Sequence, residues 1–193
     1  MGNINKREVK KQETRKLILQ KSHELYQKNG FNVSTAEIAK AADVSHGTIF
    51  AHFGTADELI TEVIIAFQHI IGKDLQAITE QEEDVEHFLY AHLKVMEKYE
   101  NFYIALLVER KILPEKIRYT TVHLQSMVSI HFIEILAKEK RQVKDIDTAM
   151  LFNTWIALVH YYLQNSELFS PQESVLKTRA KELVQTFMAL IFV

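Results

Sequence analysis

The sequence predicts an all-α protein, and three observations carry that prediction. Five glycines and two prolines among 193 residues leave few turns, which disfavours sandwiches and barrels, since these need a turn about every ten residues. No glycine follows Gly72, so the remainder should form long helices. Apolar residues recur at three- and four-residue steps, the spacing of helices that bury one face. We expect about nine helices.

Helices in the first half are marked by their capping residues. Ser34 and Thr55 each begin a capping box, completed three residues later by a glutamate that satisfies a free backbone N–H group. Ser45 is a third candidate N-cap. The expected helices span 12–29 with Gly30 beyond the end, a short helix after Ser34, 46–52, and a helix from Thr55 to Gly72 or beyond.

In the second half, the acidic cluster Glu80, Glu82, Glu83, Asp84 and Glu86 marks a helix start, because carboxylates favour the positive end of the helix dipole. An acidic recognition patch is the alternative. Ser170 to Glu173 form a capping box with Pro171 at the first helical position, and should open the last helix. The expected helices span 84–99, 101–111, 114–139, from Asp145 or Asp147 to about 167, and from Ser170 onward.

Composition excludes several kinds of site. The chain has no cysteine, which excludes disulfides, thiolate zinc sites and cysteine nucleophiles. The N-terminus lacks the apolar core of a signal peptide. The most apolar stretch, 150–163, contains Asn153, Thr154 and His160, and therefore predicts a buried helix rather than a membrane span. We expect a cytoplasmic protein with no membrane partner, no cofactor and no metal site.

Charge is distributed unevenly along the chain. Residues 1–30 carry eight basic and three acidic side chains, whereas residues 61–193 carry 14 basic and 18 acidic ones. A basic end on a mildly acidic body suggests nucleic acid or an anionic surface as the partner of that end. A solvated tail is the alternative.

The stretch from Ser34 to Phe53 has the layout of a helix-turn-helix. Two short helices flank a four-residue joint at 42–45, and the small Ala39 and Ala42 allow the helices to cross closely. The second helix begins with Ser45, His46, Gly47 and Thr48, which are small or polar enough to enter a major groove. Gly47 costs about 1 kcal/mol relative to alanine in a helix, so either a close approach to DNA or close helix packing should require it.

These residues resemble the TetR family of bacterial one-component transcriptional regulators. The resemblance covers residues 10–62 and rests on Ile18, Leu25-Tyr26, Gly30-Phe31, Thr35, Ile38-Ala39, Ala42, Val44-Ser45, Gly47 to Phe50, His52-Phe53 and Glu58-Leu59. It implies a basic arm with a three-helix DNA-binding domain at 1–55, and a larger helical ligand-binding and dimerisation domain at 56–193.

The resemblance also implies DNA contacts. Thr35 and His52 would contact phosphates, and Ser45, His46 and Thr48 would contact bases or nearby phosphates, with Gly47 close to the groove. Phe50 would pack on the sugar-phosphate backbone, with core packing as the alternative. The family usually has tyrosine at Phe50, lysine at Ala56 and glycine at Asp43. We expect Lys10, Lys11 and Arg15 of the basic arm to supply the missing phosphate contacts.

The last two helices predict a homodimer. Leu176, Ala180, Leu183, Phe187 and Leu190 form a coiled-coil-like seam, and the helix around Trp155 is apolar nearly all round, so both need two partners. The resemblance implies a four-helix bundle between two copies and a palindromic operator, with Trp155, Leu176, Leu183, Phe187 and Leu190 at the interface. A thick monomeric core is the alternative.

The family resemblance further implies a small, often apolar ligand. Ordinary core packing is the alternative for each candidate pocket residue. The candidates are Phe88, His92, Met96, Phe102, Tyr103, Met127, His131, Phe152 and Trp155. We expect a sequence-specific regulator, a repressor released from its operator by that ligand. The alternatives are a helical module that binds protein or anionic membrane through its basic end, and a helical enzyme. The chain has no glycine-rich phosphate loop, nucleophile elbow or zinc-hydrolase pair, so we expect no enzymatic activity.

Overall fold

The computed structural model describes residues 6–79 and 84–193, apart from the side chains of 78–79 and 118–124, and it confirms the all-α class. The described residues form ten helices, against about nine expected. They are α1 (Lys6–Asn29), α2 (Thr35–Ala41), α3 (His46–Phe53), α4 (Ala56–Thr79), α5 (Val85–Lys98), α6 (Glu100–Val108), α7 (Glu115–Lys138), α8 (Thr148–Gln164), α9 (Ser166–Phe169) and α10 (Val175–Ile191).

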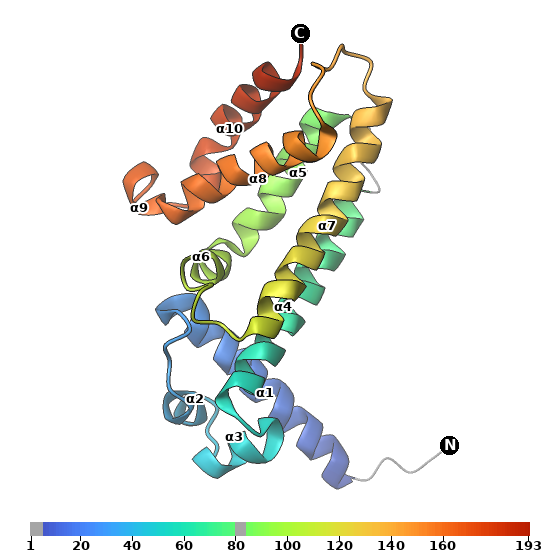
Figure 1. The fold of residues 1–193 in the computed structure, drawn as a ribbon. Helices are drawn as coiled ribbons and strands as arrows, with labels where there is room; N and C mark the ends of the chain where they lie inside the picture. Colours follow the sequence, from blue (N-terminus) through green and yellow to red (C-terminus); the bar gives the residue numbers. More distant parts are fainter. Residues whose placement is uncertain (1–5, 80–83) are drawn as a thin grey trace, which may run out of the picture.

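The molecule is elongated, with α1, α2 and α3 at one end and α8, α9 and α10 at the other (Figure 1). The long helix α4 connects the two ends, because it packs on α1 and α3 at its start and on α5 and α7 further along. The short helix α6 also joins them, since it packs on α1 on one side and on α8 on the other. Two helices of the body therefore contact the N-terminal helices directly.

Most of the helix starts follow the sequence. Both capping boxes form: Glu37 N–H donates to Ser34 Oγ at 3.2 Å, and Glu58 N–H donates to Thr55 Oγ1 at 3.1 Å. Asp84 caps α5 by accepting from His87 N–H at 2.9 Å. The rest of the acidic cluster up to Glu83 lies outside the described residues, as do residues 1–5 of the arm.

Two helix boundaries differ from the expectation. Helix α1 begins at Lys6 rather than at residue 12, because residues 6–11 are mostly good helix formers although they have no buried face. Helix α10 begins at Val175 with Ser174 as its N-cap, so the capping box at Ser170 was wrong. Residues 166–169 form the separate one-turn helix α9 instead.

The start of α10 is fixed by a distant carboxylate. Glu100, at the start of α6, is only 8% exposed and accepts hydrogen bonds from the N–H of Val175 at 2.9 Å and of Leu176 at 3.3 Å. It also accepts from the hydroxyl of Ser174 at 2.5 Å. These bonds satisfy N–H groups that a helix start leaves free, and the acceptor lies 75 residues earlier in the chain.

Aromatic rings fill the core at both ends of the molecule. In the body, Trp155 packs on Phe187 with ring centroids 5.2 Å apart, and Phe132 contacts Phe88 at 5.9 Å. Between body and N-terminal helices, the buried Phe102 of α6 contacts Phe67 of α4, His23 of α1 and Phe31 after α1, at 4.1, 4.5 and 5.5 Å respectively. Phe102 therefore holds three parts of the chain together.

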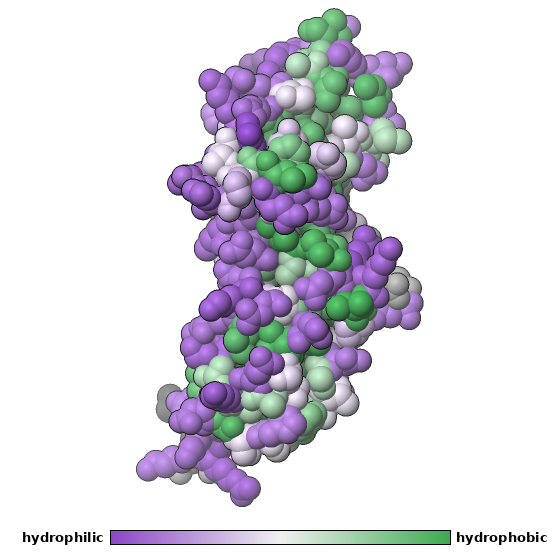
Figure 2. Space-filling view, turned by 90° about the vertical axis from the view of Figure 1, so that its left-hand side faces the viewer, coloured by the Kyte–Doolittle hydropathy of each residue, from purple (hydrophilic) through white to green (hydrophobic). Residues whose placement is uncertain are grey.

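The face in Figure 2 is mostly hydrophilic, and its apolar side chains emerge in separate groups. None of the helices in the described part of the chain is long and apolar enough to cross a membrane.

Candidate nucleic-acid interface

Helices α2 and α3 and the turn between them form the expected helix-turn-helix. Ile38, Ala39 and Ala42 are buried on one side of the turn, and Ile49 and Phe53 on the other. The turn closes through a hydrogen bond from Val44 N–H to the carbonyl of Ala39 at 3.0 Å. Asp43 has a φ of 52°, the left-handed region that explains why glycine is usual there and why aspartate is accepted.

The outer face of α3 is open to solvent. His46, Gly47 and Phe50 are exposed, Phe50 to 40%, so Phe50 is not part of the core. A Cβ atom added to Gly47 would meet only Ser45 Oγ, at an ordinary contact distance of 3.9 Å. Helix packing therefore does not require glycine at position 47, and the close approach to DNA stays a prediction.

Hydrogen bonds connect the polar side chains on this face and fix their orientation. Oγ1 of Thr35 and Nε2 of His46 share a hydrogen bond of 2.8 Å, and the His46 ring stands edge-on to Phe50 with ring centroids 5.0 Å apart. Ser45 caps α3 by accepting from Thr48 N–H at 3.2 Å, and its hydroxyl also bonds that of Thr48 at 2.8 Å. Four of the predicted contact residues thus lie together at the start of α3.

His52 lies on the same helix, one end of its ring turned inward. Its Nδ1 is buried and has no hydrogen-bond partner among the described residues. Burial, followed by the positive charges of Lys11 and Arg15, lowers the pKa of His52. The lowered pKa favours the uncharged form of the His52 ring.

Among the basic residues of α1, Arg15 contacts other helices, whereas Lys10 and Lys11 are exposed to solvent. Arg15 forms an ion pair with Glu62 of α4, and its guanidinium lies over the ring of Phe53, 4.8 Å from the centroid. Arg15 therefore fastens α1 to α3 and α4, and its expected phosphate contact stays a prediction. Lys10 and Lys11 are exposed, and Lys11 is close enough to His52 to affect its charge.

Most of the candidate ligand residues lie in the core of the body. Phe88, His92, Met96, Phe102, Tyr103, Phe152 and Trp155 are buried, whereas Met127 is 38% exposed and His131 is half-buried beside Glu134. Phe102 belongs to the joint with α1 described above. The buried members around Trp155 pack on one another and on Phe132.

Two histidines of the body, the buried His92 and the half-buried His160, have polar partners. Trp155 Nε1–H donates to Nδ1 of His92 at 3.2 Å, and the hydroxyl of Tyr103 bonds Nε2 of His160 at 2.9 Å. Burial, with repulsion from His160, lowers the pKa of His92 to about 4. Burial and the charge of Arg110 likewise lower the pKa of His160 to about 4. Both rings are neutral groups in the interior at physiological pH.

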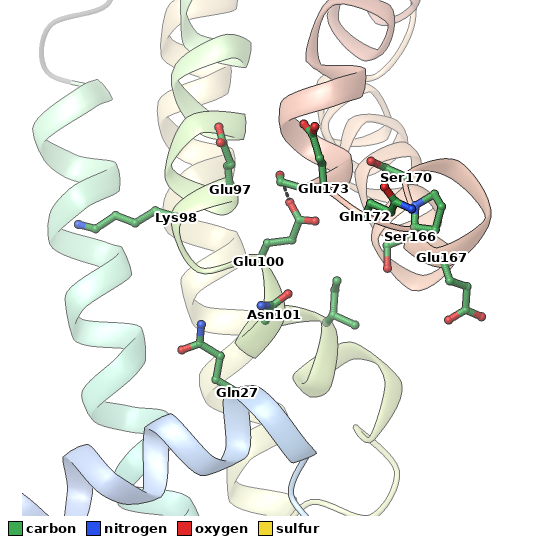
Figure 3. Close-up of a pocket in the computed structure, with 13 residues that line it drawn as sticks. Gln27, Glu97, Lys98, Glu100, Asn101, Ser166, Glu167, Ser170, Gln172 and Glu173 are labelled. Carbon is green, nitrogen blue, oxygen red and sulfur yellow. Dashed lines mark hydrogen bonds between the residues drawn. The ribbon is translucent and has the colours of Figure 1, made fainter.

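A polar cavity of about 440 Å³ opens between α1, the α5–α6 junction and the α9–α10 connection (Figure 3). Its charged lining is mainly carboxylates, from Glu97, Glu100, Glu167 and Glu173. Lys98 extends away from the cavity to bond Asp74 of α4 at 2.7 Å. None of the candidate ligand residues lines this cavity. A second cavity, of about 350 Å³ between α7 and α8, is lined in part by Phe152.

The residues expected at a dimer interface are mostly inside a single chain. Trp155, Leu176, Leu183 and Phe187 are at most 2% exposed, because α10 packs on α5 and α8 and uses its seam there. Leu190 is 51% exposed. Helix α8 instead leaves an exposed row at helical spacing, formed by Met150, Asn153, Ala157 and Tyr161.

The structural roles of two carboxylates could not be predicted from the sequence. Glu100 caps α10, as described above. Glu109 follows α6, and both of its oxygens accept from the N–H of Phe31, at 3.2 and 3.0 Å. The bonded partners lie 74 to 78 residues away in the chain, and no local pattern relates them.

Comparison with known proteins agrees with this geometry. Residues 18–63 match the family model described as bacterial regulatory proteins, tetR family. Among curated proteins, no sequence matches the chain.

Solved structures extend the likeness to the whole chain. A TetR-family regulator from Agrobacterium tumefaciens has 17% identity and a TM-score of 0.78, covering 95% of this chain and 100% of that one. A transcriptional regulator from Saccharomonospora viridis, in complex with choline, has 18% identity, coverages of 94% and 99%, and a TM-score of 0.78. FadR from Bacillus subtilis, in complex with stearoyl-CoA, has 12% identity, coverages of 89% and 96%, and a TM-score of 0.70.

The fold and the site together define a helix-turn-helix DNA-binding regulator with a large helical body. Residues 18–63 match the model of the tetR family, and the described residues as a whole share the all-α fold of these solved regulators. The family and these neighbours are transcriptional regulators, not enzymes.

Proposed function

We propose that this chain is a sequence-specific repressor that binds a palindromic operator as a homodimer and leaves it when the body binds a small molecule. The observation that carries the proposal is the outer face of α3, where His46, Gly47 and Thr48 are gathered on a helix-turn-helix of the TetR family. We also propose that the protein acts in the bacterial cytoplasm, where the operator DNA is.

We propose that the two parts of the chain have different functions. We assign DNA binding to residues 1–55 and ligand binding and dimerisation to 56–193. Helices α4 and α6 run between the two parts, so a change in the body can reach α1 through Phe102 and Glu109. A ligand releases DNA only if it binds better to a form in which the two DNA-binding units are wrongly spaced.

Ligand binding is supported by two kinds of observation. The body contains a polar cavity of about 440 Å³, a size that suits a small molecule. Structural neighbours are complexes with choline and with stearoyl-CoA. The carboxylates around the cavity favour a polar or cationic ligand there, whereas an apolar ligand would have to enter the aromatic interior around Trp155.

Base reading by Thr48 provides the first test. Bound duplexes are selected from a random library, and one enriched duplex and a scrambled one are titrated with wild-type protein and with Thr48→Ala. The substitution should cost about 1–3 kcal/mol on the enriched duplex and little on the scrambled one, because a base contact carries sequence information. Equal losses on both duplexes would remove Thr48 from the base-reading set.

The same titration at two salt concentrations separates the alternatives. DNA binding through several phosphate contacts weakens steeply with salt. A helical module that binds only protein or anionic lipid would enrich no duplex sequence from the library.

The dimer is tested on the exposed row of α8. Ala157 is exposed and small, so Ala157→Glu should fold normally but place bulk and charge between two copies. Sedimentation equilibrium should show a wild-type dimer at micromolar concentration and a monomeric variant. Ala137→Glu, at an exposed position of α7, is the matched control and should stay dimeric. A wild-type monomer would contradict the proposed assembly.

A further inference from the structure

The ring of His46 in α3 is contacted by Thr35 of α2 and by Phe50 of its own helix. The 2.8 Å hydrogen bond between Thr35 Oγ1 and Nε2 of His46 occupies that nitrogen, and Phe50 meets the ring edge-on at an interplanar angle of 80°. These two contacts fix the ring and leave Nδ1 as its unoccupied nitrogen among the described contacts. His46 is exposed, on the face of α3 that would enter the groove.

The protons available to this pair are limited. A threonine hydroxyl has one proton and a neutral imidazole has one N–H group. In the free protein either group can donate to the other. A phosphate oxygen only accepts, so once the Thr35 hydroxyl donates to DNA phosphate, its oxygen can only accept from Nε2–H of His46. The neutral ring is then left with Nδ1 as a hydrogen-bond acceptor.

We propose that Thr35 is a positioning residue that sets which bases His46 reads. When Thr35 is bound to phosphate, Nδ1 of His46 accepts from an exocyclic amino group in the major groove, N6 of adenine or N4 of cytosine. Guanine and thymine present only acceptors on their major-groove edges and are rejected. This inference rests on the proposed function and names the base class that the same site recognises.

The experiment is a selection from a random duplex library at pH 8 with wild type, His46→Ala, Thr35→Val and Thr35→Ser. Wild type should enrich one position per half-site as adenine or cytosine, and His46→Ala should lose the preference at that position alone. Thr35→Val keeps the shape but not the hydroxyl, so it should lose the same preference, with guanine gaining as Nδ1–H becomes available. Thr35→Ser should retain it.

A chemical substitution in the DNA gives a second readout. Removing the amino group at this position, with purine for adenine or 2-pyrimidinone for cytosine, should weaken wild-type binding about tenfold and leave His46→Ala unchanged. Lys10→Gln is the control for a phosphate contact that carries no base information. It should lower affinity for all sequences and leave the base preferences as they are.

Several results would overturn the inference while leaving the proposed function intact. These are a His46-dependent position at which removal of the amino group leaves wild-type binding unchanged, no position that depends on His46, or Thr35→Val with lowered affinity but an unchanged base preference. If wild type enriches no sequence at all, the inference and the proposed function are both wrong.

Discussion

At the scale of single residues, the buried His92 couples the stability of the body to pH. It is 4% exposed, it accepts from Trp155, and its pKa of about 4 lies well below the ordinary 6.5 because burial disfavours the charged ring. Between these two values the unfolded chain binds a proton that the folded protein does not. Stability is therefore complete above about pH 6.5 and is lost as the pH falls towards 4.

We predict that His92→Gln reduces this acid sensitivity. Glutamine can still accept from Trp155 but does not titrate, so up to about 3 kcal/mol of the loss between pH 6.5 and 4 should disappear. Urea unfolding at a series of pH values measures it. His69→Gln, which changes an exposed histidine of α4, should keep the wild-type pH dependence. An unchanged pH dependence in His92→Gln would show that His92 is not the responsible group.

At the scale of elements, the joint between α1 and α6 depends on Gly30 and Glu109. Gly30 has a φ of 75°, and a Cβ atom there would lie 2.1 Å from Oε1 of Glu109. That carboxylate holds the N–H of Phe31, which precedes the helix-turn-helix. The turn after α1 is thus shaped around a side chain from α6, and this links the body to the DNA-binding end.

This arrangement predicts a non-additive pair of substitutions. Gly30→Ala should cost backbone strain of about 1–2 kcal/mol and also displace the carboxylate, whereas Glu109→Ala should lose only the hydrogen bonds to Phe31. In the double variant the bonds can be lost only once, so its cost should fall short of the sum by about 1 kcal/mol. Urea unfolding of the four proteins completes the cycle. Strict additivity would mean that the two residues do not act on each other.

At the scale of the whole molecule, what could be predicted depended on the range of the interactions. The capping boxes at Ser34 and Thr55 were readable because both partners lie within one helix turn. The start of α10 was not, because Glu100 of a distant helix fixes it. The apolar seam with Leu183 and Phe187 was expected at a dimer interface, but in the structure both residues are buried within one chain. Periodicity does not say whether the covering helix belongs to the same chain or to a second copy.

In the candidate DNA-binding site, too, local patterns were predictable and contacts between helices were not. The helix-turn-helix and its outer residues follow from a local pattern, so their positions were predictable. The bond between Thr35 and His46 arises from the crossing of two helices, and the pairing of Arg15 with Glu62 from the packing of α1 on α4. Side-chain partners between helices require the three-dimensional structure.

We propose that two copies of this chain place their α3 helices in successive major grooves of one palindromic operator. Hydroxyl-radical footprinting of the wild-type protein on its selected duplex tests it most directly. We predict two equal protected regions related by a two-fold axis, with centres one helical turn, about 34–36 Å, or a multiple of it apart. A single protected region, or protection without two-fold symmetry, would contradict the claim.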